Sequence, residues 1–150
     1  MSRALTGMFL TMLAIGAATA SATVGPRPID WPLNAPLAHP GGSKLAGLAL
    51  IRVQPGPKVC WRITLSDPST LPATAAHLSR NVGGQSGDAA LVTFTPPRDG
   101  RSSGCVAAPQ AVVDGLRKQP RNYMVVVRTA AGSVRGVVRP FVRYQPGPGR

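Results

Sequence analysis

The sequence predicts an all-β protein, an antiparallel β-sandwich with one short helix. Short apolar runs with partial alternation outnumber helical segments. The 17 glycines and 16 prolines separate those runs with turn signals. Only the stretch 108–120 has helical spacing. A chain of 150 residues with this pattern has room for one ordinary domain.

Residues 1–22 have the pattern of a signal peptide. Arg3 precedes an uncharged run with an apolar centre, and small residues around Ala20 and Ala22 offer two cleavage sites. We therefore expect a secreted or otherwise extracytoplasmic protein. The alternative is an uncleaved membrane anchor, because the uncharged run approaches the roughly 20 residues that span a bilayer.

Residues 23–43 are predicted to form a proline-rich linker. Regularly spaced proline disfavours both a helix and a central strand. His39 is expected to be a linker residue and not a ligand. The prolines of this segment are Pro26, Pro28, Pro32, Pro36 and Pro40.

The predicted domain spans 44–144 and begins with a hairpin. The runs 44–53 and 58–66 read as strands, joined by the turn "QPGP" at 54–57. In the second strand Trp61 lies on the apolar face as a core anchor. Cys60 lies on the opposite face, where it suits a tether to a covering loop.

The remaining elements follow in order. We expect a strand over 89–96, a loop over 96–104, a helix within 108–120 and a second hairpin over 122–144. The helix assignment rests on the spacing of Ala111, Val112, Gly115 and Leu116, and on Pro109 and Pro120 at its ends. Gly83, Gly84 and Gly87 are expected to be turn residues with positive φ. Residues 145–150 are expected to be a disordered tail.

The two cysteines, Cys60 and Cys105, allow a single internal pairing. Export to an oxidising compartment would let this disulfide form and persist. It would close a loop over 45 residues of sequence separation. The alternative is a pair of free, buried thiols.

The net charge of +12 comes from 17 Lys and Arg against 5 Asp and Glu. Such a secreted chain is attracted to anionic polymers, membrane head groups or nucleic acid. The basic residues form no dense run, and seven aromatic residues offer little base stacking, so specific nucleic-acid binding is not expected. A solvated basic surface without any ligand remains the alternative.

Three motifs in order resemble the CHRD (chordin) domain, a module of secreted proteins. They are "VCWRITL" (59–65), "TAAHLSRNVGGQSGDAALVTF" (74–94) and, after a cysteine, "LRKQPRNYMVVVRTAAGSVRGVV" (116–138). The resemblance covers about 45–141. It implies a sandwich of immunoglobulin-like or superoxide-dismutase-like character, with a binding or structural role and no catalytic activity.

This chain departs from the CHRD pattern at two histidine positions. The family has a second histidine where this chain has Ser79, and a histidine where it has Arg128. One imidazole beside a permanent cation does not hold a metal, so no metal site and no cofactor are expected. The remaining candidates for anion binding are His77, Arg80, Arg128 and Arg135. The alternative is a His77 bonded to a main-chain carbonyl beside solvated arginines.

Enzyme chemistry finds little support. The chain has two histidines, no glutamate and aspartates without an evident mate, so neither a serine triad nor paired-carboxylate catalysis is expected. The sequence therefore predicts a secreted, non-enzymatic CHRD-domain protein that acts as a binding or structural module of the envelope or extracellular space. Two alternatives are a basic adhesion protein that binds anionic wall polymer or lipid, and a degenerate relative of a metal-binding sandwich enzyme.

Overall fold

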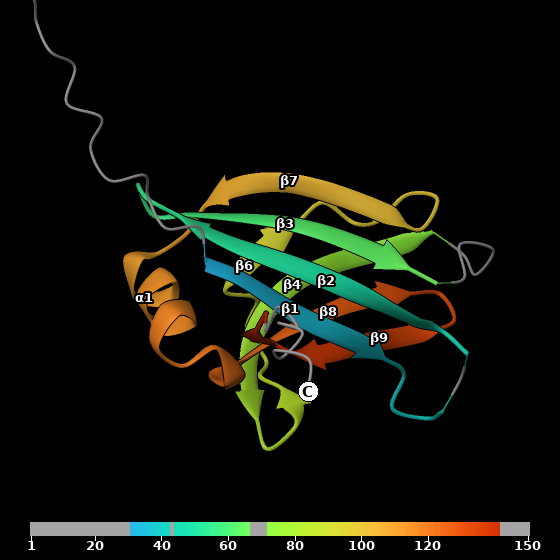
Figure 1. Ribbon diagram of the computed structural model, residues 1–150. Coiled ribbons are helices and arrows are strands. Elements are labelled where there is room, and N and C mark those ends of the chain that lie inside the picture. Colours follow the sequence, from blue (N-terminus) through green and yellow to red (C-terminus); the bar gives the residue numbers. More distant parts are fainter. Residues whose placement is uncertain (1–30, 43, 67–71, 142–150) are drawn as a thin grey trace, which may run out of the picture.

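The computed structural model describes residues 31–42, 44–66 and 72–141. The predicted signal peptide at 1–22, the first part of the predicted linker and the predicted tail at 145–150 lie outside these ranges. Figure 1 shows the elements. They are β1 (Trp31–Ala38), β2 (Ala46–Gln54), β3 (Lys58–Leu65), β4 (Ala73–Val82), β5 (Gln85–Ser86), β6 (Val92–Phe94), β7 (Arg101–Ala107), α1 (Gln110–Lys118), the 3₁₀ turn η1 (Pro120–Asn122), β8 (Tyr123–Thr129), β9 (Gly132–Val137) and β10 (Arg139–Pro140).

The predicted all-β class with one short helix is confirmed. The strands form a single curled antiparallel sheet, in the order β5-β4-β8-β9-β1-β2-β3-β7, with β6 paired to β4 and β10 paired to β1. The two layers of the predicted sandwich are therefore formed by opposite parts of one sheet. In Figure 1 β2, β3 and β7 cross the upper part of the molecule, β8 and β9 cross the lower part, and α1 lies at one end.

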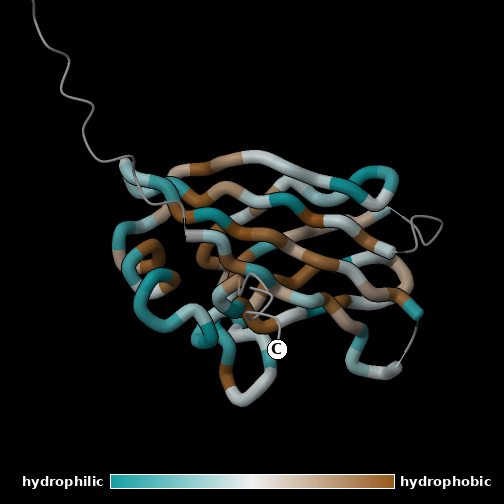
Figure 2. Tube along the Cα trace, in the orientation of Figure 1, coloured by the Kyte–Doolittle hydropathy of each residue, from teal (hydrophilic) through white to brown (hydrophobic). Residues whose placement is uncertain are grey.

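The first predicted hairpin is confirmed. Strands β2 and β3 pair over eight residues, from Gly47↔Leu65 to Gln54↔Lys58. Gly56 occupies the connecting turn with φ +76°. Buried and exposed residues alternate along β3 except at the disulfide-bonded Cys60, which is also buried, and Trp61 lies on the buried face, as the sequence predicts. Figure 2 shows this alternation as hydrophobic and hydrophilic segments along the strands.

Trp61 joins three strands inside the curl. Its ring stacks on Phe94 of β6 with the centroids 4.8 Å apart. Its Nε1–H donates a hydrogen bond of 3.0 Å to Ser102 Oγ of β7. The hydroxyl of Ser102 in turn donates to the carbonyl of Thr95, just after β6. These contacts bring the two ends of the sheet together across the core.

The prediction of a linker over 23–43 is wrong for residues 31–38, which form β1. This strand pairs with β2 over eight residues and lies between β2 and β9. Leu33, Ala35 and Leu37 are buried in the core. The domain therefore begins before residue 44, and the predicted boundary there is also wrong.

Both prolines of β1 lie where their missing N–H is not needed. The carbonyl of Pro32 accepts from the amide of Phe141, so the main-chain groups of Pro32 point away from β2. Pro36 is in phase with Pro32, and its carbonyl faces Gly136 of β9. On this side β1 makes two residue pairs with β10 and one with β9, whereas the β2 side carries the continuous ladder. Because the two prolines are four residues apart, the main-chain groups of both point away from β2. The continuous ladder with β2 therefore loses no N–H donor.

The predicted loop over 96–104 is wrong for its last part, because β7 begins at Arg101. Small residues and Gly104 give this segment a weak strand signal, and pairing with β3 overrides it.

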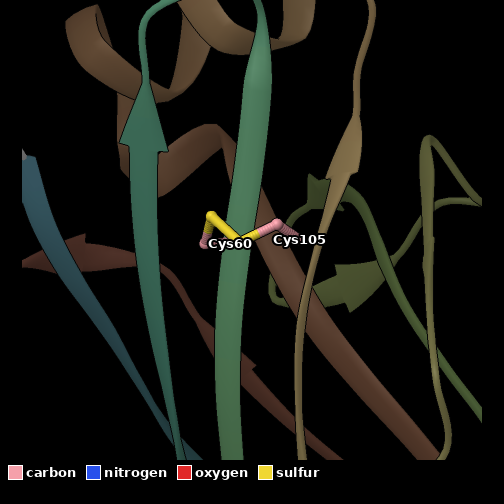
Figure 3. Close-up of a disulfide and its surroundings, with 2 residues drawn as sticks. All are labelled: Cys60 and Cys105. Carbon is pink, nitrogen blue, oxygen red and sulfur yellow. A yellow bond between two sulfur atoms is a disulfide. The ribbon is translucent and has the colours of Figure 1, made fainter.

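The predicted disulfide is confirmed: Cys60 and Cys105 are bonded. They lie directly opposite each other on adjacent strands (Figure 3), so the expected tether to a covering loop is wrong.

The helix is confirmed at 110–118, directly after Pro109, with η1 beginning at Pro120. It buries Val112, Val113 and Leu116, whereas Ala111 is exposed, because the buried stripe lies slightly to one side of the expected one.

The glycine prediction is confirmed for Gly83 and Gly84, which have positive φ, and wrong for Gly87. A Cβ on Gly87 would come within 3.3 Å of the Arg80 Cβ, so this glycine permits close approach of two chain segments.

The predicted strand over 89–96 is shorter than expected and pairs with β4 only over 92–94. The second predicted hairpin is present as β8 and β9.

We predict that the double variant Cys60→Ala/Cys105→Ala loses roughly 4 kcal/mol of unfolding free energy, the chain-entropy value for a bridge of this separation. Denaturant titrations of the variant and the oxidised parent would measure the loss. Reducing the parent should reproduce it. Rapid alkylation of both cysteines in unreduced protein would contradict the bridge.

Gly104→Ala should destabilise the fold by about 1–3 kcal/mol through overpacking. The added Cβ would lie 2.8 Å from the Trp61 ring, which is wedged between Phe94 and β7. Denaturant titration with tryptophan fluorescence would report both the loss and the displaced ring. Ser103→Ala, at the exposed neighbour, is the matched control. Equal stability of the two variants would contradict tight packing of the Trp61 ring against Gly104.

Candidate functional site

Three of the four predicted anion-binding residues lie on one outward face of the sheet. His77 of β4 lies opposite Val126 of β8, which lies opposite Arg135 of β9. Arg128 is two residues from Val126 and so shares its face, diagonal to His77. Val126 is buried between them. His77 and Arg135 are thus separated by two strand spacings, roughly 9–10 Å.

Arg80 lies apart from these three residues. It lies opposite Tyr123, and its guanidinium carbon stands 4.9 Å from the centre of that ring. Tyr123 is buried in the core at the end of the sheet next to α1. Arg80 has the phase of the core residues Ala76 and Leu78, and a strand directs alternate side chains to opposite faces.

His77 is a weak partner for an anion near neutral pH. Partial burial lowers its pKa below the ordinary value of 6.5, and the positive charge of Arg128 lowers it further. The imidazole is therefore largely uncharged at neutral pH. Within the described ranges it makes no hydrogen bond, so the alternative of a carbonyl partner is also not observed. This face therefore offers two cations, Arg128 and Arg135, at diagonal positions on neighbouring strands, beside an imidazole that carries little charge.

The described residues contain no group of three histidine, cysteine, aspartate or glutamate side chains that could share a metal ion. His77 has Ser79 as its neighbour on the same face of β4, in place of a second imidazole. Nor is any helix in this part of the chain long and apolar enough to cross a membrane.

A stronger concentration of positive charge lies on the outward face of β2, β3 and β7. Side chains at alternate positions of β3 point outward, and the register aligns them with outward residues of both neighbours. Arg62 lies opposite Leu50 on one side and Ser103 on the other. We call the resulting set the arginine face. It consists of Arg52, Lys58, Arg62 and Arg101, all of them exposed.

The disulfide lies in the middle of the arginine face. Cys60 lies opposite both Arg52 and Cys105, and a shallow hollow surrounds the bridge. Arg52, Arg62 and Ser103 contribute polar groups to its wall, and Leu50 contributes apolar surface. A second hollow adjoins it along Arg62, Thr64 and Arg101. The bridge fixes β7 against β3 at this point, and so fixes the spacing of the basic side chains.

The guanidinium groups of Arg62 and Arg101 make no ion pair or hydrogen bond within the described ranges. Each therefore presents its N–H fork to solvent. Guanidinium forks match the paired oxygens of carboxylate, phosphate and sulfate groups. The Ser103 hydroxyl beside Arg62 adds a neutral donor. The arrangement suits a surface ligand with repeated anionic groups better than a single enclosed small molecule.

The arginine face combines residues of three segments, and the sequence analysis considered each of these segments by itself. Alternation along β3 already placed Arg62 opposite to the core, on the face of Cys60. The charge appeared scattered because Arg52, Arg62 and Arg101 belong to three different strands. Register alone brings them together, and the prediction of a loop over 96–104 excluded Arg101 from any strand.

Comparisons of the chain with protein-family models, with curated proteins and with solved structures found no match. The geometry of the described residues is therefore the basis for assigning a function.

The lowered pKa of His77 predicts a loss of stability on acidification. Between the folded pKa and the unfolded value of 6.5, the unfolded chain holds more protons, so the free energy of unfolding falls as the pH drops through that window. Denaturant titrations over pH 5–7 should show a smaller loss for His77→Gln than for the parent.

An NMR titration of the imidazole provides the direct measurement. Arg128→Gln should raise the His77 midpoint, because one of the two causes of its shift is removed. Arg139→Gln removes an exposed charge elsewhere and is the control. A parent midpoint at or above 6.5 would refute this account.

Proposed function

We propose that this protein is an extracytoplasmic, non-enzymatic binding module that attaches to an anionic polymer of the cell envelope through its arginine face. The observation that carries the proposal is the gathering of Arg52, Lys58, Arg62 and Arg101 on one sheet face around the disulfide. A sheet face of this kind is extended and shallow. It fits a linear polymer that makes several equivalent contacts.

Charge determines the class of ligand. The net charge of +12 raises the local concentration of any polyanion, and the arginine face provides directional contacts once the polymer arrives. Contacts between exposed charges are screened by salt, so binding should weaken as ionic strength rises. Phosphate, sulfate and carboxylate groups on a wall polymer all satisfy this chemistry.

The proposed location agrees with two features. The Cys60–Cys105 disulfide suits an oxidising compartment. The N-terminal sequence has the pattern of a signal peptide. The resemblance to the CHRD domain also points to a secreted binding or structural module. No arrangement among the described residues favours the metal-enzyme alternative, so we carry the binding function alone.

The test is binding of the purified chain to teichoic acid, a polyanionic wall polymer, at low and at physiological ionic strength. The double variant Arg62→Gln/Arg101→Gln should bind roughly tenfold more weakly, because exposed charge contacts contribute up to about 1 kcal/mol each. The parent should lose most of its affinity at the higher ionic strength.

The matched control is Lys118→Gln/Arg121→Gln, which removes the same charge from exposed residues at the end of α1 and in η1. Equal weakening in both variants would reduce the effect to net charge and overturn the assignment to the arginine face. Absence of salt-sensitive binding in the parent would overturn the function itself. Thermal unfolding of each variant verifies that the fold is retained.

A further inference from the structure

Strand β7 is the last strand of the sheet among the described residues, and none of them forms a strand along the outer side of its main chain. It bonds to β3 on one side and is the last strand in the order. In Figure 1 β7 forms the upper border of the molecule. At its start the strand is tied down, since Ser102 bonds to Thr95 and Arg101 exchanges two main-chain hydrogen bonds with Arg98. Beyond Ser102, no residue of the ranges 31–42, 44–66 and 72–141 pairs with this side of the strand.

The main-chain hydrogen bonds at both ends of β7 reveal which groups face outward. The carbonyl of Gly100 accepts from Leu65, and the amide of Ala108 donates to Pro57, so even-numbered residues point toward β3 and its turn. Arg101 bonds to Arg98 instead, on the other side. Because alternate residues of a strand direct their N–H and C=O groups to opposite sides, those of Ser103, Cys105 and Ala107 point to the open edge.

This edge lacks the usual protection against pairing. Natural edge strands carry proline, an inward charge or a bulge, and are often covered. From Ser102 to Ala107 the strand has none of these residues and no register shift against β3. Ser103, Cys105 and Ala107 are exposed, and the disulfide holds the strand in place from the β3 side.

We propose that the open edge of β7 binds an extended acidic segment of another polypeptide as an additional strand. The main chain of the partner would pair with the outward groups of Ser103, Cys105 and Ala107. Strand addition of this kind derives affinity from main-chain hydrogen bonds and selectivity from alternate side chains. The hydrogen-bonding groups of this site lie on the edge of β7, whereas the charges that select the partner belong to the adjoining arginine face.

Charge complementarity selects the acidic partner. Alternate side chains of an added strand would continue the outward face, so a carboxylate opposite Ser103 would lie diagonal to Arg101, with Arg62 one strand further. A second copy of this chain is disfavoured, because edge-to-edge pairing would join two arginine faces into one positive surface. Like charges placed side by side on a sheet are destabilising.

The probe is a synthetic peptide of alternating glutamate and valine, seven residues long, added to the full-length oxidised protein. We expect slowed hydrogen exchange at the amides of Ser103, Cys105 and Ala107. A peptide of the same sequence with N-methyl groups at alternate positions keeps the charges but loses the donors. It should bind at least tenfold more weakly. Equal binding of the two peptides would reduce the interaction to charge and overturn strand addition.

Ala107→Pro removes one outward N–H without removing a bond to β3, and Ala107 does not line the hollow around the disulfide. It should weaken peptide binding at least tenfold, whereas Ala107→Thr, which keeps the amide, should not. Teichoic acid binding should be unchanged in both variants, so failure of this proposal is distinguishable from failure of the proposed function. If Ala107→Pro does not fold, the comparison of the two peptides on the parent protein decides. Concentration-dependent dimers with protected β7 amides would identify a second copy as the occupant and overturn the acidic partner.

Discussion

The packing of Trp61 against Phe94 and β7 is the constraint on which the rest of the structure depends. The strands form one continuous sheet, and such a sheet acquires a closed core only if its ends approach each other. Stacking of the two rings and the hydrogen bond to Ser102 hold β3, β6 and β7 together. The absence of a side chain at Gly104 leaves room for the indole. The curl then places every second side chain either in the core or on an outward face.

The curl creates outward faces with different chemistry. On the face of β4, β8 and β9 a buried valine separates an uncharged imidazole from Arg135. On the face of β2, β3 and β7 the basic side chains surround a disulfide that fixes the spacing of two strands. Rigidity matters for a polymer contact, because immobile side chains lose less conformational entropy on binding. This difference favours the arginine face over the set predicted around His77.

The disulfide also links the surface to the edge of the sheet. It joins the strand that carries Arg62 to the strand on which the main-chain groups of Ser103 and Cys105 face away from every described strand. A terminal strand held by hydrogen bonds on one side alone would fray more readily. With the bridge in place, β7 is both the border of the basic surface and a preorganised template for another strand. Oxidation therefore supports both proposed interactions.

The sequence by itself determined the all-β class, the β2–β3 hairpin, the helix after Pro109 and the cysteine pairing, because alternation, turn residues and cysteine count act locally or leave one choice. Only the tertiary structure decided that residues 31–38 are a strand, since proline is tolerated where the neighbouring side of the strand carries few bonds. It likewise decided that Arg80 stacks on Tyr123. The arginine face depends on the register between strands distant in sequence, which single-strand patterns do not contain.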